Sequence, residues 1–293
     1  MNVGRAGWWF VAPAVIVLTL FFFAPVLMAF AMSLTDFDLY ALSDFENLRF
    51  IGFENYVRLL REPLFWKALG NTLYFVALGV PLSIGLSLGA ALLVDSKLAR
   101  FRSVFRTIYF APVVTTLVAV AVVWRYIFHT RYGFLNYGLG ALGVEPIDWM
   151  GDPRWAMPAI VILAVWKNFG YNMIILLAAL QNIPEDLYEA ARIDGASGWQ
   201  VFRHITLPGL GPVLLLVSIL TMTGYFQLFA EPYVMTEGGP LQSTLSVLYF
   251  MYEEGFKWWS LGRASAVAFL LFVLMFAVTL VQLRLGRREE ARA

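Results

Sequence analysis

The sequence predicts an all-α integral membrane protein, and three observations lead to this fold class. Of the 293 residues, 60% are hydrophobic and only 14% are charged, whereas a soluble domain carries about 25% charged residues. Six apolar runs are long enough to cross a hydrocarbon core of about 30 Å as helices of about 20 residues. These runs lack the alternating period of a membrane β-barrel, so helices remain as the way to satisfy the backbone in lipid.

The six runs are interpreted as the transmembrane helices of one bundle, in a single domain over residues 1–293. They lie near residues 8–33, 72–94, 107–129, 157–181, 210–230 and 264–284. Gly85 and Gly89 in the second run form a G-x-x-x-G step, which favours close packing of another helix in the bundle. The segment 45–71 is amphipathic, with Phe and Trp among charged residues, and predicts an interfacial helix that leads into the second span.

The distribution of Lys and Arg predicts the orientation of these spans. The short loop DSKLARFRSVFR (95–106), with Lys97 and Arg100, and the terminal RLGRREEAR (284–292), with Arg292, are the densest in positive charge. Short cytoplasmic loops carry an excess of Lys and Arg. We therefore expect both termini in the cytoplasm, together with the polar stretch 182–209.

Two adjacent acids stand in the last external stretch of this arrangement. They are Glu253 and Glu254, within YFMYEEGFKWW (249–259). We expect them to form a solvated face, and the alternative is that they contact an external binding protein.

The composition excludes several classes of function. The formal net charge of +1 leaves no basic excess for binding nucleic acid. Cysteine is absent, which excludes disulfides, thiolate nucleophiles and iron–sulfur clusters, and the two histidines, His129 and His204, do not suggest a metal site. The spans hold no pair of acids and no Ser–His pairing, so no enzymatic activity is predicted. The pattern G-x-x-x-x-G-K-[ST] is also absent, so energy must come from another chain or from an ion gradient.

The cytoplasmic stretch YEAARIDGASGWQVFRHITLP (188–208) predicts two short helices joined at a glycine. Pro184, Glu185 and Asp186 suit a helix start, because proline fits the first turn and acids favour the positive end of the helix dipole. Gly195 suits the left-handed position that ends a helix. Two short helices outside the bilayer are therefore expected.

The second of these helices has its own start and stop signals. Ser197 and Gln200 fit the S-x-x-Q capping box, and Pro208 is expected to end the helix. We call the stretch from residue 182 to residue 209 the cytoplasmic loop.

Three interpretations of the cytoplasmic loop compete. A simple connector is usually shorter. A DNA-binding helix-turn-helix requires a basic face, and here Glu and Asp outnumber Arg. The third interpretation is a docking site for a cytoplasmic partner. Small residues would allow close approach: Ala190, Ala191, Gly195, Ala196 and Gly198. Apolar residues would serve as anchors: Leu187, Ile193, Trp199, Val201 and Phe202.

The same stretch resembles the EAA loop of the permease subunits of binding-protein-dependent ABC importers. The family pattern is Glu-Ala-Ala, two variable positions, Asp-Gly-Ala, then a Phe and Ile-Thr-Leu-Pro. The matching residues are Glu189, Ala190, Ala191, Asp194, Gly195, Ala196, Phe202, Ile205, Thr206, Leu207 and Pro208. The segment YVMTEGGPLQST (233–244) resembles the T-x-G-G-P segment of carbohydrate-type members, with Glu237 at the variable position. Within that branch it resembles the first permease of the maltose, lactose and glycerol-phosphate systems.

The resemblance implies a fold and a set of partners. The fold is the six-helix bundle of the type I ABC importer permease class, N-in and C-in, with a cytoplasmic coupling loop. The partners are a second permease that completes a heterodimer, two copies of a cytoplasmic ATPase subunit, an extracytoplasmic solute-binding protein and a sugar or polyol. ATP would be hydrolysed by the partner subunits, and this chain would need no cofactor. The location implied is the cell (inner) membrane of a prokaryote.

The resemblance also implies that the EAA helix seats in a cleft of an ATPase subunit. The residues expected to make this contact are Glu189, Ala190, Ala191, Asp194, Gly195, Ala196 and Phe202. Closure of the ATPases would then move the spans between inward-facing and outward-facing states.

Polar and aromatic residues within the fourth and fifth runs are candidates for the solute path. Polar groups deep in a span are costly and usually face a cavity or a partner, and aromatic and amide side chains suit sugars. The candidates are Asn168, Tyr171, Asn172, Tyr225, Gln227 and Glu231. The alternative is that they form hydrogen bonds between helices.

A self-contained ion-coupled transporter or channel is the competing function. It would need ionisable relays within the spans. Lys167 and Arg125 are the positions that qualify, and the sequence suggests no buried acid as their partner.

Overall fold

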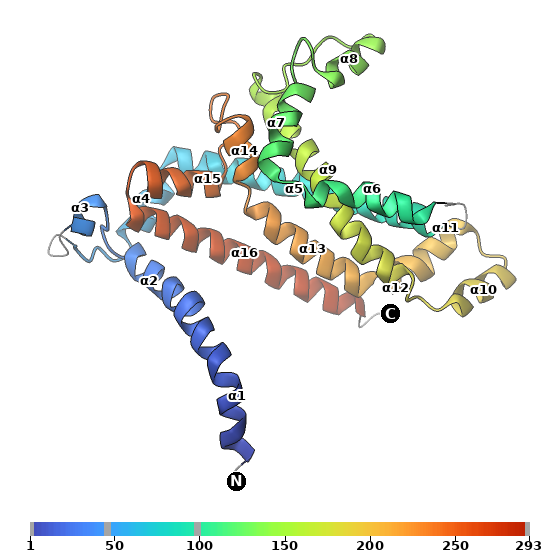
Figure 1. The fold of residues 1–293 in the computed structure, drawn as a ribbon, viewed down its shortest axis with the longest axis horizontal. Helices are drawn as coiled ribbons and strands as arrows, with labels where there is room; N and C mark the ends of the chain where they lie inside the picture. The colour runs from blue at the N-terminus through green and yellow to red at the C-terminus, as the bar shows by residue number, and fades with distance from the viewer. Residues whose placement is uncertain (1–2, 44–47, 97–100, 291–293) are drawn as a thin grey trace. The chain divides into compact units, whose positions relative to one another are not determined.

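The computed structural model describes residues 3–43, 48–96 and 101–290, and the regular structure there is helical apart from one backbone bridge between Thr35 and Phe50 (Figure 1). Lys97, Arg100 and Arg292, which contributed to the predicted orientation, lie outside the described residues. Contacts group the chain into two units. The first is Met1–Trp66 with Phe250–Val273, and the second is Lys67–Tyr249 with Leu274–Ala293.

Four helices among the described residues are long and apolar enough to cross a membrane: Trp8–Ser33, Pro63–Asp95, Pro153–Leu180 and Leu261–Gly286. The first is continuous through α1 (Val3–Leu18), the π-helical η1 (Thr19–Phe23) and α2 (Ala24–Ser33). The others are α5 (Pro63–Asp95), α9 (Pro153–Leu180) and the membrane-crossing part of α16 (Leu261–Glu290). The predicted first, second, fourth and sixth spans are thus present as helices.

The predicted third span is bent. It consists of α6 (Arg102–Val114) and α7 (Leu117–Ile127), which meet at 101°. The predicted fifth span corresponds to α13 (Gly211–Phe226), and the helical segment Gly198–Gly209 of the preceding loop meets α13 at 66°. The described residues therefore contain four helices long and apolar enough to cross a membrane, or up to six if each bent pair counts as one span.

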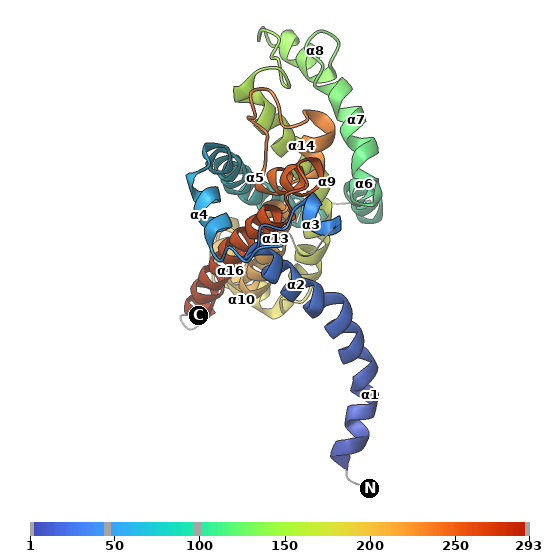
Figure 2. The same cartoon turned by 90° about the vertical axis from the view of Figure 1, so that its left-hand side faces the viewer.

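Thr115 and Thr116 break the third span. Both have extended backbone, with ψ of 148° and 134°, and Pro112 one turn earlier has no N–H for the helical ladder. Figures 1 and 2 show α7 leaving the direction of α6 and carrying α8 (Phe134–Ala141) at its far end. The composition stays apolar across the break, so the sequence predicts one span over residues 107–129.

Shorter helices connect these elements. They are α3 (Leu39–Ser43), α4 (Glu54–Arg61), α10 (Glu185–Ile193), α11 (Gly198–Val201), η3 (Phe202–Thr206), α12 (Leu207–Gly209), α14 (Ala230–Met235), α15 (Val247–Tyr252) and η4 (Glu253–Lys257). The predicted interfacial helix is α4, and α5 begins at Pro63, earlier than the expected residue 72, because proline suits a first helical turn.

The core of the second unit lies between α5, α9 and α13. Its buried side chains are Ala90, Ala91, Val94, Phe169, Met173, Leu176, Leu177, Leu180, Leu210 and Val217. Ser87 on α5 donates to the carbonyl oxygen of Phe169 on α9 at 2.9 Å. Gly85 and Gly89 lie on an exposed face, with no atom within 4 Å of a Cβ built on either. The prediction that Gly85 and Gly89 pack against another helix is therefore wrong within this chain. Ser87 lies on the face of α5 that packs against α9 instead.

Gly170 allows α6 and α9 to approach closely. A Cβ built on Gly170 would overlap the carbonyl oxygen of Tyr109 and approach the backbone of Phe110. A glycine is therefore required where the two helix backbones meet.

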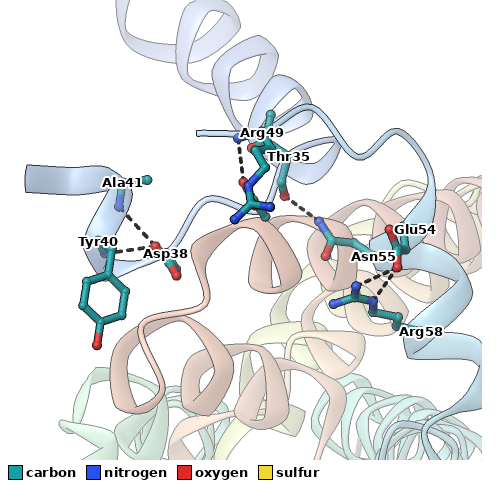
Figure 3. A network of polar contacts seen from close by, with 9 residues as sticks. Thr35, Asp38, Tyr40, Ala41, Arg49, Glu54, Asn55 and Arg58 are labelled. Atoms are coloured by element: carbon teal, nitrogen blue, oxygen red, sulfur yellow. Dashed lines mark hydrogen bonds and ion pairs between the residues drawn. The ribbon is translucent and has the colours of Figure 1, made fainter. Parts of the chain in front are cut away.

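In the first unit, Asn55 of α4 closes the C-terminal end of α2 (Figure 3). Its side-chain amide donates to the carbonyl oxygens of Ser33 at 2.9 Å and Thr35 at 2.8 Å. Carbonyls that follow the last turn of a helix lack an intrahelical partner. The neighbouring turn is closed by Asp38, whose carboxylate accepts hydrogen bonds from two backbone N–H groups. A buried amide thus terminates the first membrane-crossing helix.

The first unit also contains a buried acid. Glu254 is 9% exposed and forms an ion pair with Arg263 at 3.3 Å, while Glu62 lies 3.9 Å from the same guanidinium. Burial raises the pKa of the Glu254 carboxyl, and Arg263 acts against this rise. The expectation of a solvated face is therefore wrong for Glu254, because the start of α16 returns against it.

Replacing Gly170 by alanine should destabilise the chain by about 1–3 kcal/mol, the usual cost of overpacking. The measurement is the thermal unfolding midpoint of the purified chain in detergent. Gly85→Ala is the matched control, because its Cβ meets open space and alanine has the higher helix propensity. Equal midpoints for the two variants would contradict the close approach of α6 and α9.

Candidate functional site

The first helix of the cytoplasmic loop, α10, ends in a Schellman motif. Gly195 has φ +74°, and its N–H donates to the carbonyl of Arg192 at 3.2 Å, while Ala196 donates to Ala191 at 2.9 Å. These two bonds are the 5→2 and 6→1 pairs that satisfy the last carbonyls of a helix. The predicted left-handed glycine is confirmed, and it sets the angle at which the second helix leaves.

The second helix begins with the predicted capping box. Gln200 N–H donates to the Ser197 hydroxyl at 3.4 Å, and Ser197 N–H donates to the Gln200 side chain at 2.7 Å. The predicted stop at Pro208 is wrong, because helical structure continues through α12 to Gly209 and the bend follows at Leu210. The π-helical turn of η3 precedes this proline, which occupies the first turn of α12, where a missing N–H is tolerated.

The predicted docking residues differ in exposure. Glu189, Ala190, Asp194 and Gly195 are exposed, whereas Ala191, Ala196 and Phe202 are half-buried. The predicted anchors Ile193 and Trp199 are 87% and 67% exposed. No atom lies within 4 Å of a Cβ built on Gly195. The loop therefore presents apolar side chains and an open glycine on its surface.

A hydrogen bond joins the two arms of this loop. The hydroxyls of Tyr188 on α10 and Thr206 at the end of η3 lie 3.2 Å apart. Thr206 is buried. The loop is thus connected internally at its base as well as through its glycine turn.

A cavity of about 480 Å³ lies among α9, α13 and α14 in the second unit. All six predicted solute-path residues line it: Asn168, Tyr171, Asn172, Tyr225, Gln227 and Glu231. The residues predicted from the fourth and fifth runs thus lie on the sides of α9 and α13 that line this cavity.

Hydrogen bonds distinguish these side chains. Asn172 is almost fully buried, and its amide donates to the Thr221 hydroxyl at 2.8 Å, which joins α9 to α13. Asn168 donates to the carbonyl of Ala164 on its own helix at 3.0 Å. The amide group of Asn172 therefore forms an inter-helix hydrogen bond, which is the alternative to a role in the solute path. Asn172 nevertheless also lines the cavity.

The hydroxyl of Tyr225 is a buried polar group at the cavity. Tyr225 is 5% exposed. Its hydroxyl lies near Ser83 and Asn168, but it meets the geometry of a hydrogen bond with no described group. The hydroxyl oxygen is itself shielded from solvent, so Tyr225 lines the cavity with its side chain while its polar end lies within the protein.

Some lining residues were missed by the sequence analysis. Phe75 on α5 places its ring 5.0 Å from that of Tyr225, and Leu117 and Leu248 also line the cavity. Gly79 makes room for this arrangement, because a Cβ built there would lie 2.7 Å from the Tyr225 ring. No local pattern separates these residues from the many apolar residues of their helices, so only the packing identifies them.

The T-E-G-G-P segment forms a loop bonded to the start of α5. Glu237, Leu241 and Gln242 have φ between 50° and 60°, a region that non-glycine residues rarely adopt. The Asn71 side chain donates to the carbonyls of Gln242 at 2.8 Å and Leu245 at 2.9 Å. The segment is therefore held in a specific conformation by side chains of α5.

Membrane-crossing helices around a cavity, with an exposed two-helix loop, define a multi-pass membrane transport component. The chain belongs to the family described as binding-protein-dependent transport system inner membrane component, whose model matches residues 82–290.

Individual relatives agree with this assignment. The lactose transport system permease protein LacF of Rhizobium radiobacter is 38% identical over 289 residues, which cover 97% of this chain and 95% of that protein. The trehalose/maltose transport system permease protein MalF of Thermococcus litoralis is 37% identical over 283 residues, covering 97% and 94%. The chain is therefore a permease subunit of an ABC importer, as the EAA loop predicted.

The fold also matches a solved structure. The crystal structure of a bacterial ABC transporter involved in the import of the acidic polysaccharide alginate aligns with a TM-score of 0.79 at 23% identity. The alignment covers 97% of this chain and 96% of that chain. This match shows the fold, and together with the family assignment it confirms the predicted fold class, the all-α fold of ABC importer permeases.

Gly79→Ala should destabilise the chain by about 1–3 kcal/mol because the new methyl group meets the Tyr225 ring. In a Tyr225→Ala background the same substitution should cost nearly nothing. A double-mutant cycle of thermal unfolding midpoints measures this coupling. Additive effects of the two substitutions would contradict the contact between α5 and the cavity wall.

Proposed function

We propose that this chain forms half of the translocation pathway of an ATP-driven importer for a sugar or related polyol. The relatives at 38% and 37% identity are named for lactose and for trehalose and maltose. This proposal places the protein in the cell (inner) membrane of a prokaryote, beside a second permease that completes a heterodimer. An extracytoplasmic solute-binding protein delivers the solute, and a structure of the alginate transporter contains such a periplasmic protein.

The cavity is the observation that carries the solute proposal. The rings of Tyr171, Tyr225 and Phe229 line it together with the amides of Asn168 and Gln227. Sugar rings stack on aromatic faces, and their hydroxyls exchange hydrogen bonds with neutral amides and phenols.

The cytoplasmic loop is the proposed coupling element. In this mechanism Glu189, Ala190 and Asp194 contact a cleft in one of two cytoplasmic ATPase subunits, and the open face of Gly195 allows close approach. The other contact residues are Ala191, Ala196 and Phe202. ATP is hydrolysed by those subunits, so this chain performs no chemistry and holds no cofactor. An ATPase shifts the permease through contacts that differ between its two states.

Purification of the tagged chain in mild detergent from its native host should recover an ATPase, a second permease and a solute-binding protein. Mass spectrometry identifies them, and the binding protein is then screened against sugars and polyols. If the chain is recovered alone and accumulates solute in ATP-free liposomes under an ion gradient, the ABC mechanism is wrong for this protein.

Gly195→Trp should reduce the ATPase subunit that co-purifies with the chain by about tenfold or more, because an interface loss of 1.4 kcal/mol is tenfold in affinity. Gly195→Ala introduces the strain of a left-handed alanine without the large side chain of tryptophan, and this variant should still co-purify most of the ATPase subunit.

Gly143→Trp is the matched control for this variant. Gly143 also has positive φ and open surroundings, and it ends α8 with the same pair of backbone hydrogen bonds. Normal recovery of the ATPase with Gly195→Trp, or equal loss with Gly143→Trp, would contradict docking at the cytoplasmic loop.

A further inference from the structure

Lys167 on α9 is bonded to the break between α6 and α7. Its ammonium donates to the carbonyl oxygens of Pro112 at 3.1 Å and Thr115 at 2.9 Å. These carbonyls belong to the last turn of α6 and to the first extended residue after it. The charge that the sequence places in the middle of the fourth span therefore serves a neighbouring helix.

The break needs such a donor for a physical reason. The last carbonyls of a helix lack the i+4 N–H partner, and irregular backbone at membrane depth is tolerated where protein groups or a cavity satisfy it. The Pro112 carbonyl also accepts hydrogen bonds from the N–H and the hydroxyl of Thr115, whereas Lys167 is the donor to the Thr115 carbonyl. A cation at a helix C-terminus is favourable, because the carbonyl dipoles point toward it. Lys167 thus completes the hydrogen bonding at the break.

The position of α7 depends on what happens at this break. On one side, α6 is held against α9 by the close approach at Gly170. On the other side, α7 packs against α14 and contributes Leu117 to the lining of the central cavity. Since α6 is fixed, the angle at the break determines where the α7 wall of the cavity lies.

A carboxyl group on α14 lies in the same cavity lining as Lys167. Glu231 interacts electrostatically with Lys167, and both side chains line the cavity. The sequence suggested no buried acid near Lys167, and only the packing of α14 brings one there.

We propose that Lys167 is a positioning residue of the translocation pathway. Its ammonium holds the bend between α6 and α7 and so sets where the α7 wall of the cavity lies. The claim about the bend stands on the hydrogen bonds alone, and the consequence for a solute rests on the proposed function.

A distance between α6 and α7 tests this role directly. The chain contains no cysteine, so cysteines introduced at Val104 and Tyr126, both exposed, are the sole spin-label sites on it. The full chain is studied in lipid nanodiscs with its co-purifying subunits, after their accessible cysteines are replaced. The unmodified Lys167 background should show one narrow distance distribution between the two labels.

Lys167→Met keeps the stem and removes the donors, and it should abolish the narrow distribution in favour of a shifted or broadened one. Lys167→Arg restores charge and donors and should recover it. Ile162→Met on an exposed face of α9 is the control and should leave the distribution unchanged. An unchanged distribution in Lys167→Met would overturn the proposal.

Folding failure is also informative in this design. If Lys167→Met fails to assemble while Lys167→Arg assembles, a cationic donor is required at this position and the proposal is supported. If Lys167→Arg fails equally, side-chain fit rather than the hydrogen bonds governs the site, and the proposal is wrong. The label distances and the assembly of the variants are measured without a solute. If the proposed sugar substrate is wrong, the test of Lys167 is therefore unaffected.

Discussion

The constraint on which the rest of this structure depends is that backbone N–H and C=O groups in a bilayer must find partners within the protein. An uninterrupted helix meets it without help. The third span is nevertheless broken at Thr115 and Thr116. There the ammonium of Lys167, on α9, donates hydrogen bonds to the carbonyls of Pro112 and Thr115. At the end of α2, the amide of Asn55 has the same role. Long polar side chains thus compensate for the places where the helices stop.

The helix ends of the cytoplasmic loop are capped differently, by residues that lie close to one another in the sequence. Gly195 provides the left-handed residue of a Schellman motif, and Ser197 with Gln200 provides a reciprocal cap. Each device involves residues a few positions apart. For this reason the two helices and their turn could be predicted from the sequence, whereas the partner of Pro112 and Thr115 is more than 50 residues away along the chain.

The same distinction explains which parts of the candidate site could be predicted. Asn168 and Tyr171 stand out because polar groups are rare in an apolar run, and they do line the cavity. Phe75 and Gly170 carry no such signal, since their importance arises from what they meet across a helix interface. The burial of Glu254 was missed for the same reason, because its partner Arg263 approaches through the tertiary fold. Composition predicts a span well, and Pro112 marks a position where the third span can kink, but only the tertiary packing fixes the bend at Thr115 and Thr116.

The proposed mechanism requires the cytoplasmic loop and the cavity to move together, and two helices connect them. α9 carries Asn172 at the cavity and ends directly before the loop, while α13 begins directly after it and carries Thr221. The hydrogen bond of 2.8 Å between Asn172 and Thr221 joins the two helices at the cavity. A displacement of the loop therefore acts on both helices at once. Because Lys167 also lies on α9, that displacement reaches the bend of the third span, so the cavity wall formed by α7 shifts with the loop.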